Sequence, residues 1–172
     1  MIHGQYLSAG LLLLFAMFAI PMGANAEVAC PHAVAAGAPP VEAQHIFCGE
    51  INSAGKAVGF HSRPGGINPA SVRDTGAPKP KPGHPGIYNL SNFHITQNGK
   101  TATKTISTMY PDKCSMDDVL TAIRHAWRTG HKDGQQFNGM SGPGCTDANG
   151  KEFPIQGFTT PNGGRIRTGY PN

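Results

Sequence analysis

The sequence lacks the two patterns that most directly indicate a zinc site, a Cys-x-x-Cys pair and a helix with His-x-x-x-His. A zinc-dependent hydrolase needs three protein ligands around an open metal position, so this class of enzyme is disfavoured. The zinc alternative that stays open is a site built from His45, Cys48 and other thiols.

Aromatic residues are also scarce, at 8% of the 172 residues, whereas the chain has 23 glycines and 15 prolines. These proportions predict a loop-rich fold, and the apolar segments that are present argue against global disorder. The net charge of +4 gives a mild attraction to polyanions. Charge alone permits a nucleic-acid partner and is equally compatible with a solvated surface.

Residues 1–26 contain no Lys or Arg, yet they otherwise have the pattern of a secretory signal peptide. An apolar run over 11–20 precedes the small-residue site at 24–26, which predicts cleavage after Ala26. The run is short for a membrane span, and no charged stop-transfer segment follows it. We therefore expect a secreted or periplasmic protein with no stable membrane association after signal cleavage.

The rest of the chain is long enough for one domain, and we expect an extended arm over 27–40 and a folded domain over 41–172. It contains four cysteines, an even count that favours two disulfides in an exported protein. Three pairings are possible, and sequence alone does not fix the connectivity. Local loop closure favours the pairs Cys30–Cys48 and Cys114–Cys145.

The first half of the domain has mixed signals for regular structure. A short helix is expected over 41–47, followed by a turn at 52–55 and a strand near 57–58. Gly and Pro dominate 63–86, which predicts mostly irregular backbone. Two runs rich in Thr, Ile, Tyr and Phe, 87–95 and 101–110, flank an Asn-Gly pair and predict a β-hairpin.

The second half contains the clearest helix signal. Ser115 with Asp118 three residues later forms a helix cap, and an apolar stripe with helical spacing continues to Trp127. After Gly130 the pattern predicts loop. A second hairpin is expected from 153–158 and 165–170, so that the end of the chain is a strand in a sheet.

Two histidines are candidates for acid–base chemistry. His45 and His61 are separated by a Gly-containing segment that can turn the chain back, so both imidazoles could face one substrate atom. Histidine suits this work because its unperturbed pKa is about 6.5. As a bare pattern the pair is weak, since eight histidines lie in the chain and a lone His is more often structural.

Four motifs in this order resemble the bacterial EndoU-type endoribonuclease family and, more distantly, the uridylate-specific endoribonuclease of coronaviruses. The motifs are His45-Ile46 with Gly49-Glu50, Gly59-Phe60-His61-Ser62, Lys104 with Ser107-Thr108-Met109-Tyr110-Pro111, and Thr168-Gly169-Tyr170-Pro171. The resemblance covers residues 41–170. It implies an α+β fold in which antiparallel β-sheets pack beside helices.

The resemblance also implies roles for individual residues. His61 matches the family's general base, His45 its general acid and Lys104 its catalytic lysine, while Thr168 and Tyr170 match the pair that contacts the uracil and its sugar. The chemistry fits these residue types, because two imidazoles can move the two protons and an ammonium can stabilise charge on the phosphorane. The backbone N–H of Gly59 is a further candidate for that stabilisation.

The resulting hypothesis is an exported endoribonuclease that cuts single-stranded RNA at uridylates by 2′-OH transesterification, leaving a 2′,3′-cyclic phosphate. It requires no metal or other cofactor, although stimulation by Mn²⁺ stays open. We expect a monomer whose substrate is RNA. The sequence leaves open whether it acts as a toxin with an immunity protein as partner, or serves virulence or nutrient scavenging. The rival hypothesis is a non-enzymatic exported module that binds polyanions without cutting them.

Overall fold

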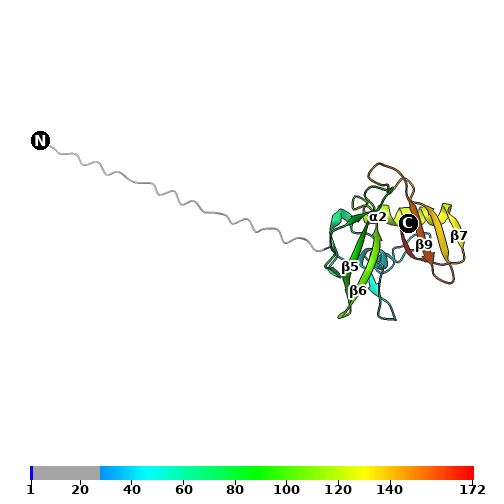
Figure 1. Ribbon diagram of the computed structural model, residues 1–172, viewed down its shortest axis with the longest axis horizontal. Coiled ribbons are helices and arrows are strands. Elements are labelled where there is room, and N and C mark those ends of the chain that lie inside the picture. Colours follow the sequence, from blue (N-terminus) through cyan, green and yellow to red (C-terminus); the bar gives the residue numbers. More distant parts are fainter. Residues whose placement is uncertain (2–27) are drawn as a thin grey trace.

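The protein is described by a computed structural model that covers Met1 and residues 28–172. The signal peptide predicted over 1–26, with its cleavage site, lies outside the described residues. The described chain has the predicted α+β fold with antiparallel sheets, and the structure gives two four-stranded sheets and one main helix (Figure 1). No helix in this part of the chain is long and apolar enough to cross a membrane.

The first sheet is built around the hairpin predicted at Asn98-Gly99. Both turn residues have positive φ, 52° and 73°, which is the backbone that this two-residue turn requires. The hairpin strands pair directly, and two short strands pair with the first of them. These elements are β5 (Tyr88–Gln97), β6 (Lys100–Met109), β3 (Val72–Arg73) and β4 (Lys79–Pro80).

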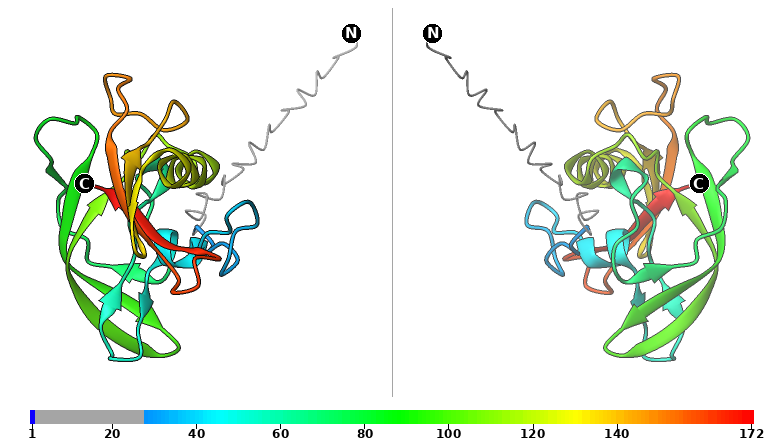
Figure 2. Two further views of the ribbon diagram at one scale, coloured as in Figure 1. Left: turned by 90° about the vertical axis from the view of Figure 1, so that its right-hand side faces the viewer. Right: turned by 90° about the vertical axis from the view of Figure 1, so that its left-hand side faces the viewer.

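The second sheet has the strand order β10-β9-β8-β7, and helix α2 (Met116–Thr129) covers one of its faces (Figures 1 and 2). Its strands are β7 (His131–Asp133), β8 (Gln136–Met140), β9 (Pro154–Thr159) and β10 (Ile166–Pro171). The predicted cap is present, because the Ser115 hydroxyl accepts from Asp118 N–H and the Asp118 carboxylate accepts from Ser115 N–H. A Cβ added at Gly169 would lie 3.1 Å from Ile123, so this glycine faces the helix.

The prediction of loop after Gly130 was wrong for residues 131–140, which form the β7–β8 hairpin. The segment carries little apolar signal, because Phe137 is its one buried residue. Its strand structure comes from pairing with β9, whose Gly157 lies opposite Phe137. A tertiary contact of this kind overrides a weak local preference.

The segment between the two sheets carries short elements that lead into the site. Helix α1 (Ala43–Cys48) and strand β2 (Ala57–Val58) were predicted. Strand β1 (Glu50–Ile51), which pairs with β2, was not. Residues 63–86 are largely irregular, apart from the 3-10 turn η1 (Pro64–Gly66) and strands β3 and β4.

The arm over 28–40 packs along the second sheet and the start of α1. Ala35 and Val41 exchange backbone hydrogen bonds, and Val41 forms a parallel bridge with Ile166 of β10. Arg124 of α2 donates to the carbonyl oxygens of Ala36 at 2.7 Å and Pro39 at 3.1 Å. The arm is therefore held by backbone pairing and by the guanidinium group of Arg124.

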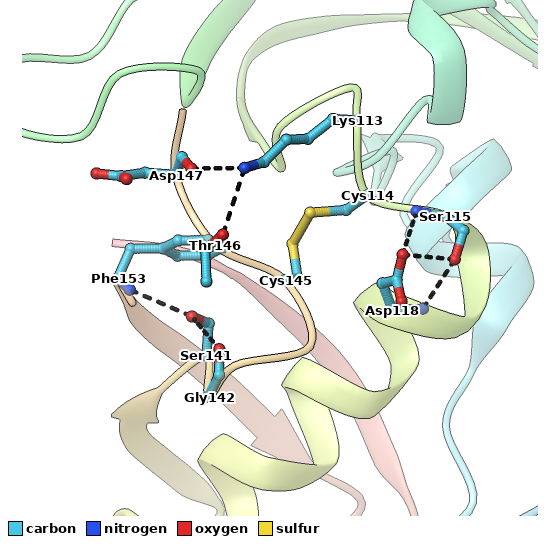
Figure 3. Close-up of a disulfide and its surroundings, with 10 residues drawn as sticks. All are labelled: Lys113, Cys114, Ser115, Asp118, Ser141, Gly142, Cys145, Thr146, Asp147 and Phe153. Atoms are coloured by element: carbon cyan, nitrogen blue, oxygen red, sulfur yellow. Dashed lines mark hydrogen bonds between the residues drawn. A yellow bond between two sulfur atoms is a disulfide. The ribbon is translucent and has the colours of Figure 1, made fainter. Parts of the chain in front are cut away.

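Two disulfides join the four cysteines in the pairs that local loop closure favoured, Cys30–Cys48 and Cys114–Cys145. The second bridge joins the turn before α2 to the loop between β8 and β9 (Figure 3). Lys113 supports the same junction by donating to the Asp147 carbonyl oxygen at 2.7 Å. The zinc alternative built on Cys48 was wrong, because each of the four sulfurs bonds to another sulfur.

Removing the Cys114–Cys145 bridge should destabilise the protein more than removing Cys30–Cys48. Loss of a native disulfide from a small exported domain typically costs about 2–5 kcal/mol. The cost should be larger for Cys114–Cys145, because both residues are buried and their sequence separation is 31 rather than 18. Thermal unfolding of the two double Cys→Ala variants measures this order, and a larger fall in Tm for the Cys30–Cys48 variant would contradict it.

Candidate active site

A groove of about 480 Å³ lies where β6 of the first sheet and β10 of the second sheet meet the end of α1. All six residues proposed from sequence line it: His45, Gly59, His61, Lys104, Thr168 and Tyr170. A larger hollow of about 630 Å³ lies between the arm and the β9–β10 turn, but Arg165 is its one ionisable lining residue. The groove therefore concentrates the groups that can do acid–base chemistry.

His45 is placed by the last turn of α1 and is only 6% exposed. Its Nδ1 lies 3.0 Å from Oε1 of Glu50, the first residue of β1. A carboxylate only accepts, so Nδ1 carries the proton and the ring orientation is fixed. The hydrogen bond from His45 is the main cause of the lowered pKa of Glu50, and burial opposes it.

His61 is 7% exposed, and its hydrogen bonds differ from those of His45. Its Nδ1 lies 3.2 Å from the Thr108 carbonyl oxygen and 3.0 Å from Ser107 Oγ. The Ser107 hydroxyl donates to the Phe60 carbonyl oxygen at 2.7 Å, so its oxygen is free to accept. His61 therefore donates through Nδ1, which leaves the lone pair of Nε2 for the groove.

Burial is the main cause that holds the pKa of His61 well below its ordinary value, and the positive charges of Lys104 and His45 add to it. The hydrogen bond to the Thr108 carbonyl opposes the shift. Burial also lowers the pKa of Lys104. His61 is thus a neutral imidazole at neutral pH, as a general base must be.

The two imidazoles lie with their centroids 6.0 Å apart and their planes at 38°. Gly59 permits this approach, because its φ is 75° and a Cβ there would come within 2.2 Å of the His45 carbonyl oxygen. Phe60 N–H, one residue later, donates to that same carbonyl oxygen at 2.8 Å. A side chain at position 59 would separate the segments that carry the two histidines.

Strand β10 forms the wall opposite β6. The Tyr170 ring stacks on His61, with centroids 5.0 Å apart and planes at 27°, and its hydroxyl donates to Gln156 Oε1 at 3.0 Å. One face of Tyr170 is therefore occupied by His61. Thr168 Oγ1 is buried and has no hydrogen-bond partner among the described residues.

The model of the family described as bacterial EndoU nuclease matches residues 41–172. The chain belongs to the bacterial EndoU nuclease family. No curated protein and no solved structure matches the chain. Family membership makes this protein a nuclease at the level of its family and agrees with the α+β fold described above.

Several groove residues of this EndoU chain were missed by the sequence reasoning. Glu50 and Ser107 lie within the quoted motifs, but only the fold shows that they contact the two histidines. Phe158 and Arg167 also line the groove, and no sequence signal marks them. Their placement depends on the register between β9 and β10, which is a tertiary property.

The lowered pKa of His61 is directly measurable. NMR titration of its ring C–H signals should give a pKa below about 6.5, the ordinary value. Lys104→Met should raise this pKa because it removes a nearby positive charge, whereas Lys100→Met, at the exposed start of β6, should not. A His61 pKa at or above 6.5, or a His61 pKa that is unchanged in Lys104→Met, would contradict the electrostatic description.

The lowered pKa of His61 also predicts how the free energy of unfolding depends on pH. Since protonation of His61 is harder in the folded state, the unfolded chain binds more protons between about pH 6.5 and the lower folded pKa. The contribution of His61 to the free energy of unfolding is therefore fully present above pH 6.5 and is lost as the pH falls through that window.

Proposed function

We propose that the protein is an endoribonuclease that cuts single-stranded RNA on the 3′ side of uridine by transesterification. The observation that carries the proposal is the pair of imidazoles 6.0 Å apart with unlike partners, a carboxylate on His45 and a backbone carbonyl on His61. Glu50 holds a proton on Nδ1 of His45, whereas burial beside Lys104 lowers the pKa of His61 and favours its neutral ring. The pair thus supplies one acid and one base.

The reaction follows from these two states. Nε2 of neutral His61 takes the proton of the 2′-hydroxyl, and the 2′-oxygen forms a bond to phosphorus. The bond between phosphorus and the 5′-oxygen breaks as His45 donates its proton to that oxygen. The products are a 2′,3′-cyclic phosphate and a 5′-hydroxyl, and each proton transfer contributes roughly 10²–10⁴-fold to the rate.

Charge on the phosphorane needs donors that are already in place. Lys104 lines the groove beside His61, where partial burial strengthens the effect of its ammonium group. Gly59 brings backbone close to His45 in the same groove. The scheme requires no metal ion, because the substrate supplies the nucleophile and the protein supplies both proton carriers.

The base site in this proposal lies on β10. Thr168 offers a buried hydroxyl with no protein partner among the described residues, and such a group is costly unless a ligand or water satisfies it. Tyr170 offers an aromatic surface next to the general base. Stacking tolerates every base, so selectivity for uracil must come from polar contacts such as Thr168.

Export and biological role are part of the proposal. Two disulfides suit an oxidising compartment outside the cytosol, which supports secretion to the periplasm or beyond. An exported RNA-cutting domain is suited to act as a toxin, and the producing cell would then need an immunity protein. Secretion of a tagged chain lacking or retaining residues 1–26 tests the export step.

His61→Ala and His45→Ala should each reduce cleavage of a uridine-containing oligoribonucleotide by about 10²–10⁴-fold in buffer with excess chelator. The matched control is His94→Ala, since His94 is a partly exposed histidine of β5 outside the groove. The wild-type rate should also fall at acid pH as His61 takes up a proton. Near-wild-type cleavage by either groove variant would refute the acid–base assignment, and RNA binding without cleavage by the wild type would favour the polyanion-binding alternative.

Thr168→Val should reduce the rate at uridine by about tenfold and narrow the ratio of uridine to other bases, because it removes one hydrogen bond. The Tm should not fall, since the lost hydroxyl has no hydrogen-bond partner among the described residues. Thr105→Val, an exposed change on β6, is the matched control. Unchanged base preference in Thr168→Val would remove Thr168 from the base site.

A further inference from the structure

Arg167 lies in the groove because of a β-bulge in β10. Ile166 pairs with Thr159 and Thr168 pairs with Phe158, so Arg167 is an extra residue with no partner on β9. In a regular strand, neighbouring residues point to opposite faces of the sheet. Arg167 and Thr168 nevertheless both line the groove, and the charge of Arg167 acts on Glu50, as expected if the bulge redirects the arginine side chain.

Arg167 and Lys104 act on different members of the histidine site. The charge of Lys104 acts on His61, whereas the charge of Arg167 acts on Glu50, the partner of His45. The direction of β10 agrees, because Tyr170 stacks on His61 while Ile166 pairs with Val41, two residues before the helix that carries His45. Arg167 is therefore on the side of the proposed acid.

The guanidinium of Arg167 is available for a ligand. It makes no hydrogen bond or ion pair within residues 28–172, and the residue is exposed and lines the groove. Glu50 is the acidic residue nearby, but its carboxylate is already bonded to His45. A planar guanidinium with unused donors suits a phosphate, which it can bind through two parallel hydrogen bonds.

We propose that Arg167 binds the phosphate that follows the leaving nucleoside, so that the protein holds RNA beyond the cut bond. The inference rests on the proposed function for one point, the assignment of His45 to the leaving 5′-oxygen. The next phosphate in the 3′ direction then lies on the His45 side of the groove, where Arg167 is. Arg167 is thus a positioning residue for longer substrates, and its contribution should depend on the presence of that phosphate.

The test compares three ligands that cannot be cut by transesterification because their uridine lacks the 2′-hydroxyl: dUpA, dUpAp with a 3′-phosphate, and pdUpA with a 5′-phosphate. Wild-type protein should bind dUpAp about tenfold more tightly than dUpA, as expected of one charge-assisted contact. Arg167→Ala should lose that gain, and Arg167→Lys should keep part of it. Arg128→Ala, an equal charge change at the exposed end of α2, should keep it fully.

Each other outcome overturns the inference. Equal binding of dUpA and dUpAp by the wild type would show that no such phosphate site exists. Equal losses in Arg167→Ala and Arg128→Ala would indicate a general charge effect, and a loss confined to pdUpA would place the arginine on the opposite side. The readout is equilibrium binding, so an Arg167-dependent gain in a protein that cuts no uridine site would support the phosphate contact while the proposed function failed.

Discussion

The site depends on a pair of backbone hydrogen bonds that join the end of α1 to the segment after β2. Phe60 N–H donates to the His45 carbonyl oxygen at 2.8 Å, and His61 N–H donates to the Ile46 carbonyl oxygen at 2.7 Å. These bonds fix the distance between two residues that are 16 positions apart in the sequence. They form only because Gly59 has no side chain, since a Cβ there would overlap the His45 carbonyl. The glycine in this motif is therefore a geometric requirement of the histidine pair.

Once the backbones are joined, the surroundings make the two rings chemically unequal. His45 faces a carboxylate from β1, whereas His61 is buried against β6 and beside an ammonium group. The inequality comes from two different sheets, because Glu50 belongs to the two-stranded sheet of β1 and β2, whereas Lys104 and Thr108 belong to β6 of the first four-stranded sheet. The Cys114–Cys145 bridge and the capped helix α2 stabilise the second sheet and hold its groove wall in place. Disulfides, helix packing and site geometry are thus parts of one arrangement.

The sequence predicted the features that have strong local causes. The Asn98-Gly99 turn, the Ser115 cap and the glycine before Phe60 each require a particular residue type at a particular place, and each was found. The β7–β8 hairpin was missed because its strands carry almost no apolar pattern and depend on pairing with β9. The groove position of Arg167 could not be predicted, because a bulge is a property of register between two strands. The six site residues came from family motifs, whereas their hydrogen-bond partners needed the fold.

The central claim is that the substrate's own 2′-oxygen is the nucleophile, activated by His61. The most direct test uses two oligonucleotides of the same sequence, each with a single uridine, which carries ribose in one and deoxyribose in the other. The account predicts cleavage only of the ribose strand, with a 2′,3′-cyclic phosphate on the uridine fragment and a 5′-hydroxyl on the other fragment. Cleavage of the deoxyribose strand at that site, or a fragment that ends in a 3′-hydroxyl, would contradict the account.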